Sequence, residues 1–127
     1  MNKKRKIKSF TDLNTWREGH KLVIMVYKVT KDFPKEETYS LTDQMRRSSS
    51  SITANIAEGF GRHSYKEKAR FYYLSQGSLT ELKDQILVAR DVGYLNKKDE
   101  SKLIDQANNT HKLLNGLITK TKSLIQD

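Results

Sequence analysis

Cysteine is absent from the 127 residues, and proline occurs once. Without cysteine the chain has no disulfide framework and no thiolate metal site, which suits a reducing compartment. The longest uncharged apolar run, residues 22–27, is far shorter than the roughly 20 residues of a membrane-spanning helix. No apolar segment of a signal peptide follows the basic amino terminus. We therefore expect a soluble, unexported protein with no membrane partner, and the cytoplasm is its default location.

Negative charge is also scarce, because 15 acidic residues stand against 24 lysines and arginines. Five of the basic residues and none of the acidic ones lie in the first ten positions, so residues 11–127 keep an excess of four positive charges. A like-charged run of this kind cannot fold alone and is typical of a solubilising or nucleic-acid-binding arm. We interpret residues 1–10 as a basic disordered tail and residues 11–127 as a single domain.

Strand signals are few, and four helical segments can be read. Their expected ranges are residues 11–32, 40–59, 64–93, and 96 almost to the end. The first stops before Pro34, since the residue that precedes proline is disfavoured in the α region. Each later helix begins at a side chain that can cap it, with an acidic residue three positions on: Ser40, Ser64 and Asn96. The sequence predicts an all-α fold, an antiparallel up-down four-helix bundle.

Two of these helices have more apolar surface than one intramolecular face requires. In the first helix one face holds Leu13, Trp16, His20, Val23, Ile24 and Tyr27, and another holds Leu22, Met25, Val26 and Val29. The third helix carries a second stripe of Leu74, Val88 and Val92, whereas the fourth has a single seam of period 3.6. A helix that is apolar on two sides needs two partners. We favour self-association over a wide intramolecular contact as the explanation.

The second helix combines a core stripe with a polar stripe and a face of small residues. The polar stripe holds Gln44, Arg47, Ser48, Ser51, Asn55 and Glu58. It is either solvated or a buried hydrogen-bond network that sets the register of a subunit interface, and we favour the network. We accordingly assign a structural or interface role to Arg47, Ser51, Asn55, Glu58 and Gly59. The small residues Ser50, Ala54 and Ala57 would let another backbone approach closely.

Two sets of basic residues are candidates for binding nucleic-acid phosphates. In the first helix they fill the gap between the apolar faces: Arg17, Lys21, Lys28 and Lys31. The second set lies near the start of the third helix, where free N–H groups and the positive dipole end favour an anion: Arg62, Lys66 and Arg70. Taken alone, this turn is better explained as a plain connection with solvated lysines. A ring of subunits would repeat each patch and multiply its phosphate contacts.

Three tyrosines near the second basic set, Tyr65, Tyr72 and Tyr73, are candidates for stacking on unpaired bases. Tyrosines at helical spacing are more often packing residues, so that alternative stays open.

The residue set of a known catalytic site is not found. His20, His63 and His111 lack metal-ligand spacing, and two of them lie on apolar stripes, where a packed histidine is the simpler interpretation. Glu58 and Glu67 flank the glycine turn, but a helix cap and an ion pair explain them better than acid and base roles. We expect no enzymatic activity, no metal and no cofactor.

The order of several motifs resembles a known family. FTDLNTW at residues 10–16, NIAEG at 55–59, YLSQGSLTEL at 73–82 and VGYL at 92–95 are similar to the bacterial 23S rRNA intervening-sequence proteins. The family name reflects where some of its genes lie and reports no biochemical activity. The resemblance implies a four-helix bundle that assembles into a cyclic homo-oligomer, with a pentamer as the expected size. A related branch, the accessory variability proteins of diversity-generating retroelements, binds a reverse transcriptase and nucleic acid.

These observations predict a non-enzymatic, oligomeric protein that binds nucleic acid through its phosphates with little sequence selectivity. We favour RNA over DNA. The alternative is an adaptor or assembly module for another protein, for example an accessory subunit of a reverse transcriptase.

Overall fold

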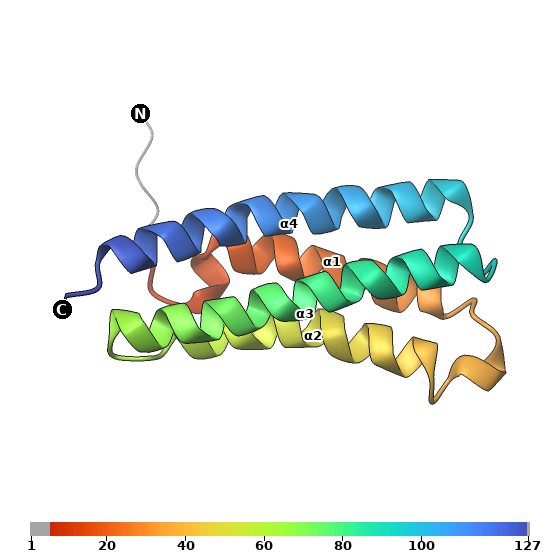
Figure 1. Cartoon of the computed structure of the whole chain (residues 1–127), viewed down its shortest axis with the longest axis horizontal. Coiled ribbons are helices and arrows are strands. Elements are labelled where there is room, and N and C mark those ends of the chain that lie inside the picture. The colour runs from red at the N-terminus through yellow and green to blue at the C-terminus, as the bar shows by residue number, and fades with distance from the viewer. Residues whose placement is uncertain (1–5, 127) are drawn as a thin grey trace.

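A computed structural model of the chain describes residues 6–126 and contains four α-helices and no strand within that range. The helices are α1 (Asn14–Thr30), α2 (Leu41–Phe60), α3 (Tyr65–Asp91) and α4 (Lys97–Ser123). Two 3-10 helices, η1 (Phe10–Asp12) and η2 (Lys35–Glu37), precede α1 and α2. The four α-helices lie side by side along the long axis of the molecule (Figure 1). The prediction of an all-α fold with four helices is confirmed.

Each helix packs against two of the other three. Helix α2 contacts α1 and α3, and α4 contacts the same two helices. Among the described residues, α1 and α3 make no direct backbone contact, and neither do α2 and α4. Helices α1 and α3 therefore stand at opposite corners of the packing.

The core consists of aliphatic side chains from all four helices. Leu22, Ile52, Leu79, Leu103 and Leu114 have no exposed surface. Burying such a side chain stabilises the fold by roughly 1.5–3 kcal/mol, so these residues supply much of the driving force for folding. The seam predicted along α4 is confirmed by five buried residues: Leu103, Ala107, Leu114, Ile118 and Thr121. Its other two members, His111 and Ile125, are half-buried.

The apolar surplus predicted for α1 and α3 lies on the outside of the chain. In α1 the inward face holds Leu22 and Val26, whereas Ile24 and Tyr27 are exposed. In α3 the second stripe is exposed at every position: Leu74, Val88 and Val92. Helix α3 thus has an apolar stripe that no other part of the described chain covers. In α1 the exposed patch is smaller, because Leu13 and Trp16 of the same face pack against the core.

Two of the three predicted N-caps are confirmed. Ser64 Oγ accepts a hydrogen bond from the Glu67 N–H at 3.1 Å, and Asn96 Oδ1 accepts one from the Asp99 N–H at 2.7 Å. The prediction for Ser40 is wrong, because its side chain makes no capping bond. Its backbone, at φ −124° and ψ −110°, is not in the extended region that places a capping oxygen over the first turn. Glu37 Oε1 accepts the Leu41 N–H instead, at 3.3 Å.

The predicted boundary between tail and domain is wrong at Ser9 and Phe10. Ser9 caps η1, with its Oγ accepting from the Thr11 N–H and its own N–H donating to Asp12. The Phe10 ring packs edge-on against Trp16, with ring centroids 5.3 Å apart. Since the cap and the ring contact hold this segment, the folded domain begins at about residue 9. Residues 1–5 of the expected tail, and residue 127, lie outside the described residues.

Helices α2 and α3 approach each other closely at Gly59. A Cβ atom there would lie 2.6 Å from Tyr72 Cε1, well inside van der Waals contact. The Tyr72 side chain is only 3% exposed and fills the space that the glycine leaves. The structural role assigned to Gly59 is thereby explained, and base stacking by Tyr72 is ruled out.

The polar stripe of α2 divides into an inner and an outer part. Ser48 Oγ donates to Gln85 Oε1 of α3 at 2.6 Å, and Ser51 Oγ bonds Ser78 Oγ at 2.9 Å. Asn55 Nδ2 donates to the backbone oxygen of Ser51 at 2.9 Å. These residues form a network between two helices of one chain and fix their register.

The outer part of the stripe faces solvent. Arg47 pairs with Asp43, and Glu58 pairs with Arg62. The interface role assigned to Arg47 and Glu58 therefore stays a prediction, since neither side chain belongs to the network within the chain.

Replacing Gly59 with alanine should lower the free energy of unfolding by roughly 1–3 kcal/mol, because the new methyl group overlaps the Tyr72 ring. Gly77 is the matched control. It lies in α3, and a methyl group added there would meet no atom within 4 Å, so Gly77→Ala should stabilise the helix by up to about 1 kcal/mol. Urea unfolding followed by circular dichroism measures both changes, and a Gly59→Ala variant as stable as wild type would contradict this contact.

Candidate nucleic-acid interface

The first two predicted cations, Arg17 and Lys21, line an open groove between α1 and α4. Arg17 Nε donates to the Thr11 backbone oxygen at 2.9 Å, and Lys21 Nζ pairs with Glu18 Oε2 at 2.8 Å. The hydrogen bond from Lys21 is the main cause that lowers the pKa of Glu18, so this carboxylate stays ionised. Asn109 of α4 also donates to Glu18, at 2.8 Å. A phosphate at this groove would meet a fixed negative charge beside its two cations.

Lys28 and Lys31 lie farther along the same helix. Both side chains are exposed, and neither makes a hydrogen bond or ion pair among residues 6–126. They lie at the carboxyl end of α1, where positive charge is favourable toward the helix dipole. Of the α1 set, these two are the side chains that can turn to a phosphate without breaking an internal contact.

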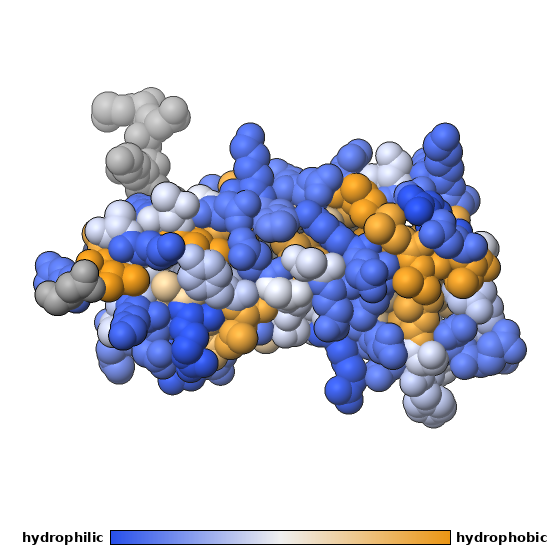
Figure 2. Space-filling view, in the orientation of Figure 1, coloured by the Kyte–Doolittle hydropathy of each residue, from blue (hydrophilic) through white to orange (hydrophobic). Residues whose placement is uncertain are grey.

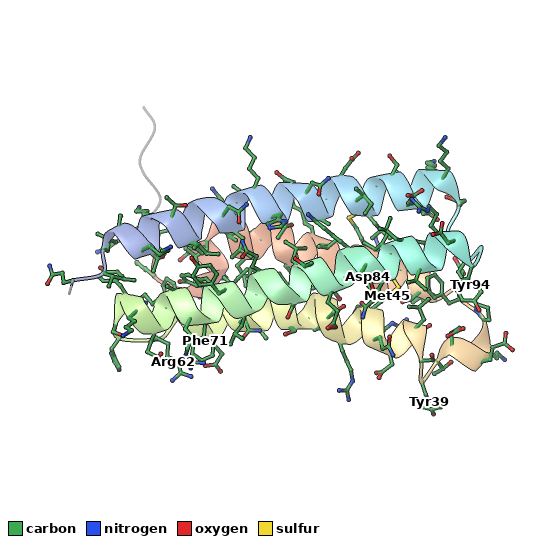
Figure 3. The ribbon with its side chains drawn as sticks, viewed as in Figure 1. Tyr39, Met45, Arg62, Phe71, Asp84 and Tyr94 are labelled. Carbon is green, nitrogen blue, oxygen red and sulfur yellow. The ribbon has the colours of Figure 1, made fainter. Side chains whose placement is uncertain are left out.

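The second predicted set surrounds the turn between α2 and α3. The guanidinium carbons of Arg62 and Arg70 lie 4.4 and 4.5 Å from the centroid of the Phe71 ring. Arg62 and Phe71 lie together at one end of the molecule in Figure 3. Each arginine also has an acidic partner, Glu58 at 3.1 Å and Glu67 at 3.0 Å. This pairing, led by the hydrogen bond from Arg70, lowers the pKa of Glu67.

The amino end of α3 is less free for an anion than the sequence indicates. The Glu67 N–H is already bonded to Ser64, and the Glu67 carboxylate lies in the first turn. All three cations of the set are exposed, and Lys66 is the one whose side chain makes no hydrogen bond or ion pair among the described residues. Any phosphate here must be held by side chains more than by the helix end.

The seven predicted cations do not form one site. Four lie on α1 or directly after it, and three lie on or beside the start of α3; these helices occupy opposite corners of the packing. The helical period of the sequence predicts which side of its own helix each set lies on. It carried no information about how far apart the two helices would lie.

Sequence reasoning missed several cations that contact another helix. Lys68 Nζ donates to the Phe60 backbone oxygen at 2.6 Å and closes the end of α2, and its burial lowers the pKa of the ammonium. Lys122 of α4 lies over the Tyr73 ring of α3, 5.8 Å from its centroid. The sequence offers one signal for Lys122: it lies two residues after Lys120 in a segment without acidic residues.

His111 is held by a lysine of the neighbouring helix. Lys83 Nζ donates to His111 Nδ1 at 2.8 Å, so this nitrogen is the unprotonated acceptor of the ring. Burial, and then the Lys83 charge, lower the pKa of His111.

No group of three or more His, Cys, Asp or Glu side chains with metal-binding geometry occurs in residues 6–126. In the same part of the chain no helix is both long and apolar enough to cross a membrane.

The pKa of His111 should lie below the ordinary value of 6.5, and Lys83→Met should raise it only part of the way, because burial is the larger cause. Below about pH 6.5 the unfolded chain takes up this proton before the folded one, so the free energy of unfolding should fall as the pH drops. An NMR titration of the ring protons measures the pKa. A value above 6.5 in the folded wild-type protein would contradict the Lys83 contact.

Comparison with known proteins agrees with this architecture. The family model of the 23S rRNA-intervening sequence proteins matches residues 11–116. A crystal structure of a protein of unknown function from the S23 ribosomal protein family of Bacteroides thetaiotaomicron is similar, with a TM-score of 0.74. It is 17% identical, and the match covers 82% of this chain and 97% of that one, so the likeness concerns the fold. No curated protein matches the sequence. The chain belongs to the 23S rRNA-intervening sequence protein family.

Proposed function

We propose that the protein is a non-enzymatic, oligomeric, antiparallel up-down four-helix bundle that binds nucleic acid, with RNA favoured, through basic surfaces of little sequence selectivity. The observation that carries this proposal is the excess of positive charge: the net charge is +9, and the exposed side chains of Lys28, Lys31 and Lys66 make no hydrogen bond or salt bridge among the described residues.

The paired cations remain available to phosphates. Lys21, Arg62 and Arg70 keep 65%, 43% and 56% of their side chains exposed. Exposed ion pairs contribute only about 0–1 kcal/mol each, so a nucleic-acid phosphate can compete with the internal carboxylate. Because such contacts involve the backbone and not base edges, they carry little sequence information.

The positions of the exposed apolar patches on α1 and α3 support self-association. A cyclic assembly joins unlike patches of neighbouring subunits, head to tail. The faces on α1 and α3 are such patches, since the two helices stand at opposite corners. On the side seen in Figure 2, hydrophobic residues gather around the carboxyl end of α3. A pentamer is the size that the family resemblance implies.

The purified protein should therefore have a mass several times 14.7 kDa in light scattering at micromolar concentration. Ile24→Glu and Val88→Glu, one change in each apolar face, should each reduce the mass, because a buried unpaired carboxylate is costly. Tyr39→Glu is the control and should leave the mass unchanged, since Tyr39 is 95% exposed in a connecting segment. A wild-type monomer would refute this assembly.

The logarithm of the affinity for RNA should fall linearly with the logarithm of salt concentration, by about 0.7–0.9 for each phosphate neutralised. Lys28→Glu with Lys31→Glu should lower the affinity for all RNA sequences alike and should reduce the slope of affinity against salt concentration. Lys97→Glu with Lys98→Glu is the control, because it changes the net charge by the same amount at the start of α4. A smaller loss of affinity in this control would show that Lys28 and Lys31 act through local phosphate contacts and not through the overall charge. Fluorescence anisotropy over a salt series measures the slopes.

A form that lacks residues 1–7 separates the basic amino terminus from the folded domain and keeps the Ser9 cap. If the oligomer of this form bound neither RNA nor DNA at low salt, the basic surfaces of the domain would have no such role. The exposed apolar faces would then favour the second candidate function, an adaptor for another protein such as a reverse transcriptase.

A further inference from the structure

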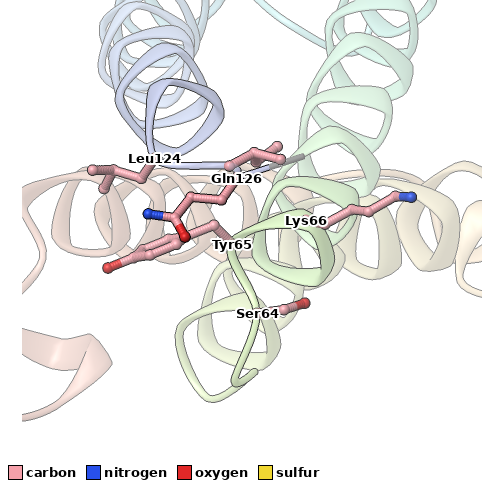
Figure 4. A pocket seen from close by; sticks show the side chains of 6 residues that line it. Ser64, Tyr65, Lys66, Leu124 and Gln126 are labelled. Carbon is pink, nitrogen blue, oxygen red and sulfur yellow. The ribbon is translucent and has the colours of Figure 1, made fainter.

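The start of α3 and the end of α4 together form a groove at one end of the molecule. A hollow of about 550 Å³ is lined by Ser64, Tyr65, Lys66, Leu124, Ile125 and Gln126. Figure 4 shows Tyr65, Leu124 and Gln126 around this hollow, with Lys66 extending in the other direction. A second hollow shares Lys66 and Ile125 with the first and continues along Arg70, Tyr73 and Lys122. We call the two hollows the α3–α4 end groove.

The end groove has two accessible aromatic rings. Tyr65 is 45% exposed and Tyr73 is 44% exposed, in contrast to the buried Tyr72 between them in sequence. Neither exposed tyrosine has a hydrogen bond from its hydroxyl group within the described chain. At a rise of 1.5 Å per residue the two positions are roughly 12 Å apart along α3, about the length of three or four stacked nucleotides.

Positive charge borders the same groove. Lys66, Arg70 and Lys122 line it, and its one acidic lining residue, Glu67, is paired with Arg70. Residues 68–80 of α3 and residues 106–126 contain no acidic residue. Lys122 already lies over the Tyr73 ring, so a cation and an aromatic face are presented side by side.

Exposed rings flanked by cations are suited to a nucleic-acid strand whose bases are unpaired. Every base can stack on an aromatic side chain while lysine and arginine contact the phosphates on either side. A duplex keeps its bases stacked inside and offers only phosphates and groove edges to such a surface. Tyr65 and Tyr73 would therefore add affinity for a single strand and none for a duplex.

We propose that the α3–α4 end groove binds single-stranded nucleic acid, with Tyr65 and Tyr73 stacking on bases and Lys66, Arg70 and Lys122 contacting phosphates. This inference rests on the proposed nucleic-acid binding and assigns it a site and a strand preference. The α1 lysines remain a separate surface that contacts phosphates of either form.

The test compares fluorescence anisotropy of a labelled single-stranded RNA of about 12 nucleotides and of a blunt-ended RNA duplex of about 12 base pairs, which has no unpaired base. Changing both tyrosines to alanine, Tyr65→Ala with Tyr73→Ala, should weaken single-strand binding by roughly tenfold or more and duplex binding by less than about twofold. Tyr65→Phe with Tyr73→Phe keeps both rings and should retain single-strand binding.

Tyr39→Ala is the matched control, because it removes an exposed tyrosine at the other end of the molecule (Figure 3). It should leave both affinities unchanged. Lys122→Ala provides a second variant that leaves the tyrosines in place, and it should weaken both RNAs and reduce the salt slope by about one phosphate contact. Circular dichroism and light scattering confirm that each variant keeps its helices and its assembly.

The outcomes separate the two proposals. Two results with an RNA-binding wild type would show that the end groove is not a stacking site. In the first, the alanine pair binds single strands as tightly as wild type; in the second, its affinity falls equally for both RNAs. The general binding proposal would stand in either case. Loss of single-strand binding in the phenylalanine pair would also overturn stacking. If wild type binds neither RNA at low salt, both proposals fail.

Discussion

The close packing of α2 against α3 is the constraint on which the rest of the structure depends. Gly59 lets the Tyr72 ring reach the α2 backbone, and farther along, Ser75 Oγ donates to the Ile52 oxygen at 2.7 Å. The Ser48–Gln85 bond joins the two helices again, about one turn farther along α2 and about three turns farther along α3. Each of these contacts needs a small residue on one side.

Together these contacts set the rotation of α3 about its axis, and so they decide which of its residues face solvent. Successive residues differ by about 100° around a helix, so the rotation that buries Tyr72 leaves Tyr73 outside.

The positive charge of the chain is distributed according to this packing. Carboxylates of the same helix partly neutralise Lys21, Arg62 and Arg70, and the partnerless Lys28 and Lys31 lie on a different corner from Lys66. Such an arrangement suits many weak phosphate contacts over a wide area better than one deep anion pocket. Repetition around an oligomer would multiply these contacts without adding any new one.

Local features could be predicted from the sequence because their causes are local. Ser64 and Asn96 cap their helices through residues three positions away, and the α4 seam needs only the helical period. The apolar faces of α1 could also be read, since spacing defines them. The pattern at Ser40 predicts a cap that the structure lacks, because the preceding η2 turn sets the backbone of Ser40. Phe10 looks like part of the tail because its ring partner, Trp16, lies beyond that segment.

The sequence by itself determined four helices, their approximate limits, two apolar faces on α1 and α3, and the family resemblance. Tertiary structure alone decided which of two apolar faces packs into the core. Periodicity shows which residues of one helix share a face, but it does not show which face the neighbouring helices will cover. Tertiary structure likewise separated the predicted cations onto two corners, and it buried Tyr72 while leaving Tyr65 and Tyr73 exposed. The contact of Lys122 with Tyr73 joins residues of two helices. A pairing of that kind depends on the distance and rotation between helices, which only the packed core sets.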